Sequence, residues 1–151
     1  MPSDLPPPPR PQGDYVPAVL ACGYVHSAGM TPRRDGVLQV RGTVGADLDV
    51  ADAAGAAGLA AANALSAVAA AAGGLDRLAR LVRMTVYVAC APGFTDLSAV
   101  ADGASALLAH HVGTGALPAR SAIGVHALPG GAPVEVELTA AVREDEVWRR
   151  R

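Results

Sequence analysis

Residues 82–90 read VRMTVYVAC, a run in which apolar side chains alternate with polar or small ones. This period of two, together with the abundance of valine, predicts a half-buried β-strand. The tripeptide Ala91-Pro92-Gly93 follows it and is typical of a strand end. Residues 95–111 then carry apolar side chains at helical spacing, which predicts an amphipathic helix.

A second, longer helix is predicted over the alanine-rich residues 50–72. Either Asp47 or Asp49 can cap its first turn, and Gly73-Gly74 can end it. Because most of its side chains are small, the helix can lie close to a sheet. It also contains polar and acidic residues, so we expect a core helix and no membrane span.

The remaining elements are predicted strands, separated by turns rich in glycine and proline. They cover residues 15–21, 23–28, 37–44, 119–127 and 133–142, and we expect the last two to form a tight hairpin. The order β-β-β-α-β-α-β-β predicts an α+β fold, a two-layer sandwich with two helices on one face of a mixed sheet. The other sheet face then needs a cover, which oligomerisation can supply.

The length of 151 residues allows one domain. We place that domain at residues 14–142, between a proline-rich arm at residues 1–13 and a charged tail at residues 143–151. The arm has no apolar periodicity to bury. We therefore expect that deleting residues 1–9 leaves folding and assembly intact.

The composition excludes several classes of function. All twelve basic residues are arginine, so lysine-based Schiff-base chemistry and a Walker lysine are absent. The formal net charge of −2 and an aromatic content of 3% argue against a nucleic-acid partner. His110 and His111 are adjacent on a helix and diverge, and two cysteines cannot form a disulfide framework. We expect a cytoplasmic protein with no metal and no cofactor.

Arg120 stands out because it opens an otherwise apolar strand, where a guanidinium needs an anionic partner. Glu135 and Glu137 share one face of the next strand. In a hairpin, Arg120 and a glutamate converge on one sheet face. The guanidinium could bind a ligand carboxylate at two points, and a glutamate could orient or deprotonate a water. A cross-strand ion pair is the alternative interpretation.

Residues 118–125, PARSAIGV, and residues 127–137, ALPGGAPVEVE, resemble the C-terminal signature of the YjgF/YER057c/UK114 family, also called the Rid family. Residues 13–18, 28–32 and 82–88 resemble three further family segments. The resemblance implies a chorismate-mutase-like fold and a homotrimer with ligand clefts between its subunits.

Members of that family hydrolyse reactive enamines and imines, such as 2-aminoacrylate, to keto acids and ammonia without a cofactor. The resemblance implies that Arg120 grips the carboxylate of a small substrate and that Glu135 positions the attacking water. The other residues that it places along the cleft are Tyr15, Gly29, Phe94, Asp102 and Ala122.

Three residues depart from the family pattern. Asp14 stands where proline is usual, Ala28 where a serine commonly helps to bind ligand, and Asp102 where many deaminases have asparagine. These departures indicate a divergent branch. A non-catalytic ligand-binding trimer, or a specialised biosynthetic enzyme that uses the same cleft, are therefore the alternatives to a deaminase.

Overall fold

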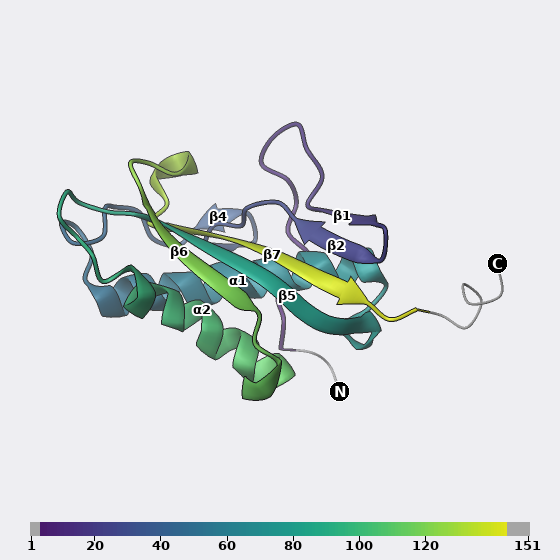
Figure 1. Cartoon of the computed structure of the whole chain (residues 1–151). Coiled ribbons are helices and arrows are strands. Elements are labelled where there is room, and N and C mark those ends of the chain that lie inside the picture. The colour runs from purple at the N-terminus through teal and green to yellow at the C-terminus, as the bar shows by residue number, and fades with distance from the viewer. Residues whose placement is uncertain (1–3, 145–151) are drawn as a thin grey trace.

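One mixed sheet of five strands carries both long helices on a single face (Figure 1). The computed structural model describes residues 4–144. In spatial order, the strands of this sheet are β1 (Ala18–Ala21), β2 (Tyr24–Ser27), β7 (Val134–Val142), β5 (Leu78–Ala89) and β6 (Ala119–Val125). The helices are α1 (Val50–Ala72) and α2 (Leu97–Val112). The smaller elements are β3 (Arg33–Arg34), β4 (Val37–Leu38) and 3-10 helices at Leu75–Arg77, Thr114–Ala116 and Pro129–Gly131.

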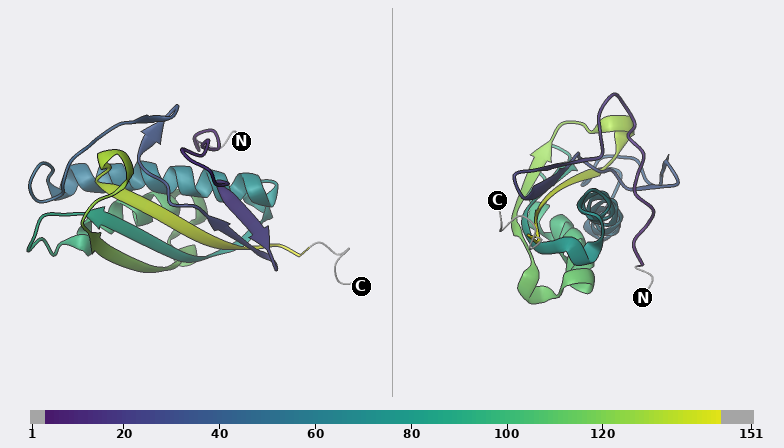
Figure 2. Two further views of the ribbon diagram at one scale, coloured as in Figure 1. Left: turned by 90° about the horizontal axis from the view of Figure 1, so that it is seen from above. Right: turned by 90° about the vertical axis from the view of Figure 1, so that its right-hand side faces the viewer.

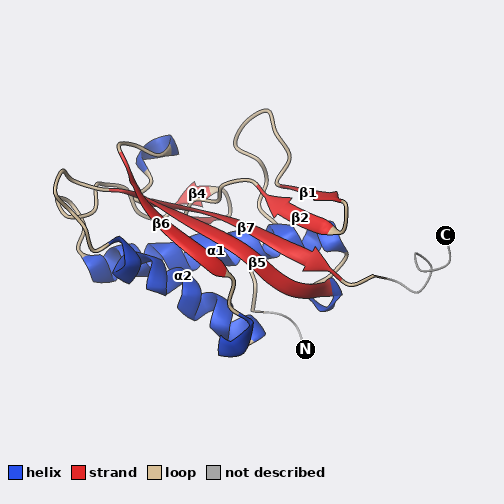
Figure 3. Cartoon of the chain, in the orientation of Figure 1, coloured by secondary structure: helices blue, strands red, loops and turns tan. Residues whose placement is uncertain are grey.

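The helices form one layer and the sheet forms the other (Figures 2 and 3), which confirms the predicted two-layer α+β fold. Successive side chains of β5 point to opposite layers. Met84, Val86 and Val88 are fully buried beneath the helices, whereas Arg83 and Tyr87 point the other way. We call the side of the sheet that carries Arg83 and Tyr87 the open face, because neither α1 nor α2 covers it.

The two C-terminal strands are not neighbours, so the predicted hairpin is wrong. Strand β5 lies between them, parallel to β6 and antiparallel to β7. A parallel pair requires a crossover connection, and α2 supplies it. Strand β6 therefore takes an edge of the sheet, and residues 126–133 lead the chain back so that β7 fills the centre between β2 and β5.

The expected strand over residues 37–44 is also largely absent. Only Val37–Leu38 forms a strand, paired with Arg33–Arg34 across a tight turn. Gly42 has a φ of 127°, which takes the chain out of the extended conformation. Val44 returns to the sheet only as an isolated bridge.

Helix α1 begins and ends where the sequence predicts. Asp49 is the N-cap, and its side chain accepts a hydrogen bond from the backbone N–H of Asp52. Asp47 instead accepts a hydrogen bond of 2.8 Å from the backbone N–H of Thr43. Among the described residues, α1 is the helix that is long and apolar enough to cross a bilayer. However, 72% of its most apolar 18-residue stretch is buried inside the protein. Helix α1 is therefore the core helix of the fold.

The two helices approach each other very closely at Gly103 of α2. A Cβ atom built on Gly103 would collide with the backbone carbonyl of Ala54 on α1. Gly58 of α1 faces the backbone of Gly103. A Cβ atom built on Gly58 would lie 3.4 Å from the Gly103 carbonyl oxygen. Small residues on both helices thus permit this packing.

The proline-rich arm packs on α1, a contact that its lack of apolar periodicity does not predict. Leu5 packs against the hydrophobic core. The hydroxyl of Ser66, which is only 5% exposed, donates a hydrogen bond of 2.6 Å to the carbonyl of Pro6. Four prolines fix the arm in an extended conformation, and α1 offers it a buried donor. Residues 145–151 of the expected tail lie outside the described residues.

Candidate functional site

Arg120 lies on the helix side of β6 and binds α2. It pairs in register with the buried Met84, so both side chains point to the same layer. Its Nη1 donates to Oδ1 of Asp102 and to the hydroxyl of Ser105, each at 2.8 Å. Its Nη2 donates to the hydroxyl of Ser98 at 2.8 Å and, more weakly, to the Ser98 carbonyl at 3.4 Å. The positive charge of Arg120 is thus already paired with a carboxylate of the same chain.

Glu135 and Glu137 project from β7 onto the open face. In register, Glu135 pairs with Tyr87 of β5. The Tyr87 hydroxyl reaches diagonally across and donates a hydrogen bond of 2.7 Å to Oε1 of Glu137. The Glu135 carboxylate lies over Gly29, where a built Cβ atom would collide with it. The absence of a side chain at Gly29 therefore makes room for the Glu135 carboxylate.

The electrostatics of this pair favour a proton on Glu135. Burial raises the pKa of Glu135 above its ordinary value, and the like charge of Glu137 raises this pKa further. The pKa of Tyr87 is also raised, chiefly because the Tyr87 hydroxyl donates its proton to Glu137. Glu135 is thus a carboxyl group that exchanges a proton closer to neutral pH than an exposed glutamate does.

Arg120 and Glu135 do not converge within one chain, so this prediction is wrong. They point to opposite faces of the sheet, and β5 separates their strands. The predicted alternative, a cross-strand ion pair between Arg120 and a glutamate, fails for the same reason. The acidic partner of Arg120 is Asp102 on α2.

Five of the seven predicted site residues fall into two groups, around Arg120 and around Glu135. Asp102 contacts Arg120, and Ala122 lies two residues along β6 on the same side. Gly29 contacts Glu135 on the other side.

Tyr15 lies in the loop before β1, where 46% of the residue is exposed. Its hydroxyl accepts a hydrogen bond from the backbone N–H of Gln12 at 3.1 Å. Among the described residues, Tyr15 has no hydrogen bond to Arg120 or to Glu135, so it belongs to neither group.

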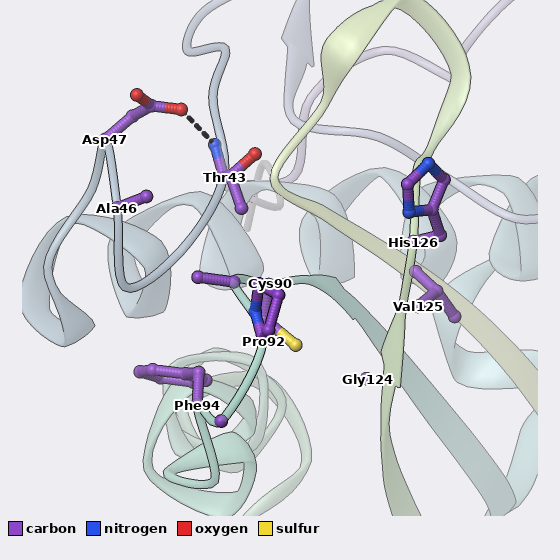
Figure 4. A pocket seen from close by; sticks show the side chains of 11 residues that line it. Thr43, Ala46, Asp47, Cys90, Pro92, Phe94, Gly124, Val125 and His126 are labelled. Atoms are coloured by element: carbon purple, nitrogen blue, oxygen red, sulfur yellow. Dashed lines mark hydrogen bonds between the residues drawn. The ribbon is translucent and has the colours of Figure 1, made fainter.

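Phe94 lines a cavity of about 590 Å³ beside the carboxyl ends of the parallel strands β5 and β6 (Figure 4). Cys90 and His126 share this cavity, and the Cys90 sulfur lies close to Gly124. Such a crevice is a common place for ligands in sheets with parallel strands. Across residues 4–144, no group of three or more His, Cys, Asp or Glu side chains could hold a metal ion.

The sequence analysis missed the two serines that bind Arg120. Ser98, Asp102 and Ser105 are spaced at i, i+4 and i+7, so they form a polar stripe on one face of α2. That stripe beside the apolar face of α2 could have indicated a polar partner on the sheet. Tyr87 carried no comparable signal, because its bond to Glu137 depends on the register between β5 and β7.

Comparisons with known proteins agree on one family. The family model described as Endoribonuclease L-PSP matches residues 7–142. The protein TCP17 of Trypanosoma cruzi is 39% identical over 134 residues, which are 88% of this chain and 84% of TCP17. The crystal structure of Atu1372 from Agrobacterium tumefaciens, a protein with unknown function, has a TM-score of 0.83 at 36% identity, covering 89% of this chain and 86% of that chain.

A more distant structure carries a ligand. It is TdcF of E. coli with bound serine, which has a TM-score of 0.64 at 25% identity and covers 94% of this chain and 96% of that chain. The chain therefore belongs to the Endoribonuclease L-PSP family, which is the YjgF/YER057c/UK114 or Rid family that its sequence resembles, and it has that family's chorismate-mutase-like α+β fold.

Proposed function

We propose that this chain is a cytoplasmic hydrolase of small, carboxylate-bearing enamines or imines, acting in clefts between the subunits of a homotrimer. The observation that carries the proposal is the half-buried Glu135 carboxyl, which lies over Gly29 and has a raised pKa. Family membership supports the reaction class. The serine bound to TdcF supports an amino-acid-like ligand.

The placement of Arg120 and Glu135 supports a site between subunits. The two residues lie on opposite faces of one sheet, so a single chain cannot bring them to one substrate. Arg120 lies on the edge strand β6, and Glu135 lies on the open face. A neighbouring subunit that contacts the open face with its β6 edge would complete the site.

In the proposed reaction, Arg120 of one subunit binds the substrate carboxylate and Glu135 of the next subunit binds a water. The water oxygen forms a bond to the imine carbon while Glu135 accepts one water proton. Glu135 returns that proton to the nitrogen of the resulting carbinolamine. The C–N bond then breaks and ammonia leaves, while the hydroxyl proton passes to Glu135 and the carbonyl forms. An enamine first moves a proton from nitrogen to carbon and becomes the imine. Positioning of water and substrate supplies most of the acceleration.

A ribonuclease activity, which the family description suggests, finds little support in this chain. The net charge of −2 gives no electrostatic attraction to a phosphate backbone. The chain has one Trp, three Tyr and one Phe, so stacking platforms for bases are scarce.

The test is turnover of 2-aminoacrylate generated enzymatically in the assay, followed as keto acid and ammonia. The wild-type protein is expected to accelerate hydrolysis over buffer. Glu135→Gln is expected to lower kcat about 100-fold or more, because the amide keeps the shape but cannot accept the proton. Arg120→Lys is expected to lower kcat/KM about 30- to 1,000-fold, because an ammonium lacks the planar fork.

Glu137→Gln is the matched control, since Glu137 lies on the same strand face but Glu135 is the glutamate that contacts Gly29. We expect it to change kcat much less than Glu135→Gln does. Hydrolysis by the wild-type protein that is no faster than in buffer would overturn the proposed activity. Equal losses in both glutamine variants would overturn the specific role of Glu135.

A further inference from the structure

The Arg120 guanidinium has few donors left for a ligand. Nη1 uses both of its hydrogens, on Asp102 and Ser105, and Nη2 uses one on the Ser98 hydroxyl. The second Nη2 hydrogen makes only the long contact of 3.4 Å to the Ser98 carbonyl. Nε makes no hydrogen bond within residues 4–144, so Nε and the weakly bonded second hydrogen of Nη2 are the donors that a ligand carboxylate could use without displacing a close partner.

Asp102 differs from the two serines in charge and in exposure. Its side chain is 70% exposed, against 21% for Arg120. Only Oδ1 of Asp102 makes a hydrogen bond within residues 4–144, and that bond goes to Arg120. The second carboxylate oxygen, Oδ2, therefore faces solvent beside the cation. A ligand that binds Arg120 enters the field of this fixed negative charge.

We infer that Asp102 makes the Arg120 site select zwitterionic ligands over simple carboxylate anions. This inference rests on the proposed function, because it assumes that Arg120 binds the ligand carboxylate. A ligand with one carboxylate and no cationic group is repelled by Asp102. A ligand that also carries an ammonium or iminium group is not, because its cation can lie near Oδ2.

The selection has a direct consequence for the proposed reaction. The protonated imine is a zwitterion, whereas the keto acid product has lost its nitrogen and is an anion. Asp102 would therefore favour binding of the substrate and release of the product. Repulsion between two charges a few ångströms apart in a solvated site changes affinity by about three- to tenfold.

The experiment compares the affinities of two probes, L-serine and pyruvate, by calorimetry on the wild-type protein and on Asp102→Asn. The substitution keeps the shape and removes the charge. We expect pyruvate to bind about three- to tenfold more tightly to Asp102→Asn, while L-serine binds equally or more weakly. The ratio of the two affinities is the readout, because a loss of folding would lower both together.

Two further variants separate the possible failures. Ser105→Ala removes the other Nη1 partner without a change of charge, and we expect it to leave the affinity ratio unchanged. Arg120→Ala should abolish binding of both probes. If Arg120→Ala binds pyruvate as the wild type does, the proposed role of Arg120 fails.

If Arg120→Ala loses binding while Asp102→Asn shifts both probes equally, the role of Arg120 stands and the selection by Asp102 is wrong. A ratio that shifts as much in Ser105→Ala as in Asp102→Asn would also overturn the inference. In that case the effect would come from the mobility of the guanidinium and not from charge.

Discussion

The Glu135 carboxylate packs directly against the backbone of Gly29. The carboxylate fills the volume that a side chain at residue 29 would take, so a larger residue at 29 would displace Glu135. Because the carboxylate is partly withdrawn from water, its charged form is destabilised in the folded protein. The protonation of Glu135 is therefore coupled to folding as well as to the proposed chemistry.

This coupling predicts how stability depends on pH. The pKa of Glu135 is raised above its ordinary value of 4.5 in the folded state. Its contribution to the free energy of unfolding is thus full below that value and is lost as the pH rises through the raised pKa. We expect Glu135→Gln to abolish this loss, so that the variant gains melting temperature relative to the wild type between pH 4.5 and neutral pH.

The measurement is the melting temperature of both proteins across that pH range. Glu137→Gln should move the wild-type loss to lower pH, because the like charge that adds to the raised pKa of Glu135 is then gone. A difference between Glu135→Gln and the wild type that does not vary with pH would contradict the prediction.

At the residue scale, the sequence singled out the site residues but not which of them contact one another. Arg120 and Glu135 could be recognised because burying a charged side chain in a strand costs free energy unless the charge has a partner. Their actual neighbours, Asp102 and Gly29, depend on which sheet face each strand presents. That depends on strand order, which no local pattern encodes.

The helices α1 and α2 are in close backbone contact where they cross. At Gly103, the neighbouring atoms belong to the backbone of Ala54, which cannot move as the end of a flexible side chain can. Any side chain at residue 103 must push the helices apart. Overpacking of this kind costs about 1–3 kcal/mol.

We therefore expect Gly103→Ala to lower the free energy of unfolding by about 1–3 kcal/mol, although alanine favours helices. Gly55→Ala on α1 is the matched control, because nothing lies within 4 Å of its built Cβ atom. That substitution should raise stability by about 1 kcal/mol. Urea unfolding of both variants checks the prediction, and equal signs for the two substitutions would contradict it.

Among the elements, regular helices and long strands were predictable and irregular segments were not. The bounds of α1 follow from Asp49 and Gly73, whose local capping geometry is the same in any fold. Residues 37–44 look like a strand in composition, but the pairing ends at Leu38 and Gly42 has a positive φ. The docking of the arm depends on Ser66, which lies sixty residues away from Pro6 along the chain.

At the scale of the whole molecule, the open face is the surface that a trimer would use. It carries three exposed large side chains, Val19, Tyr24 and Ile123, which are 49%, 45% and 43% exposed. They lie around the polar centre formed by Glu135, Glu137 and Tyr87. Apolar side chains around a polar centre are suited to contact with other copies of the chain.

We expect a particle of three times 15.1 kDa in light scattering. An obligate interface of this kind buries on the order of 2,000 Å² or more. Ile123→Asp should weaken assembly, because it would bury an unpaired charge. Val37→Asp is the control, since Val37 is 62% exposed but belongs to the small β3–β4 sheet. A wild-type monomer at micromolar concentration would contradict the prediction.

The layered architecture was predictable from the alternation of strands and helices, but the order of strands was not. A short connection between two strands suggests a hairpin, and residues 126–133 have the turn residues for one. The apolar face of β7, with Val134 and Val136 fully buried, instead fills the centre of the sheet. The position of β7 in the sheet depends on the total apolar area that is buried and not on the residues of the turn.

The central position of β7 constrains how the chain can be made. This strand is the last strand of the sheet in chain order, yet β2 and β5 both pair with it. Until residues 134–142 are synthesised, the β1–β2 hairpin has no place in the sheet and one edge of β5 is unpaired. The sheet is therefore completed only after residues 134–142 are available, and any truncation upstream of β7 leaves an exposed edge that invites aggregation.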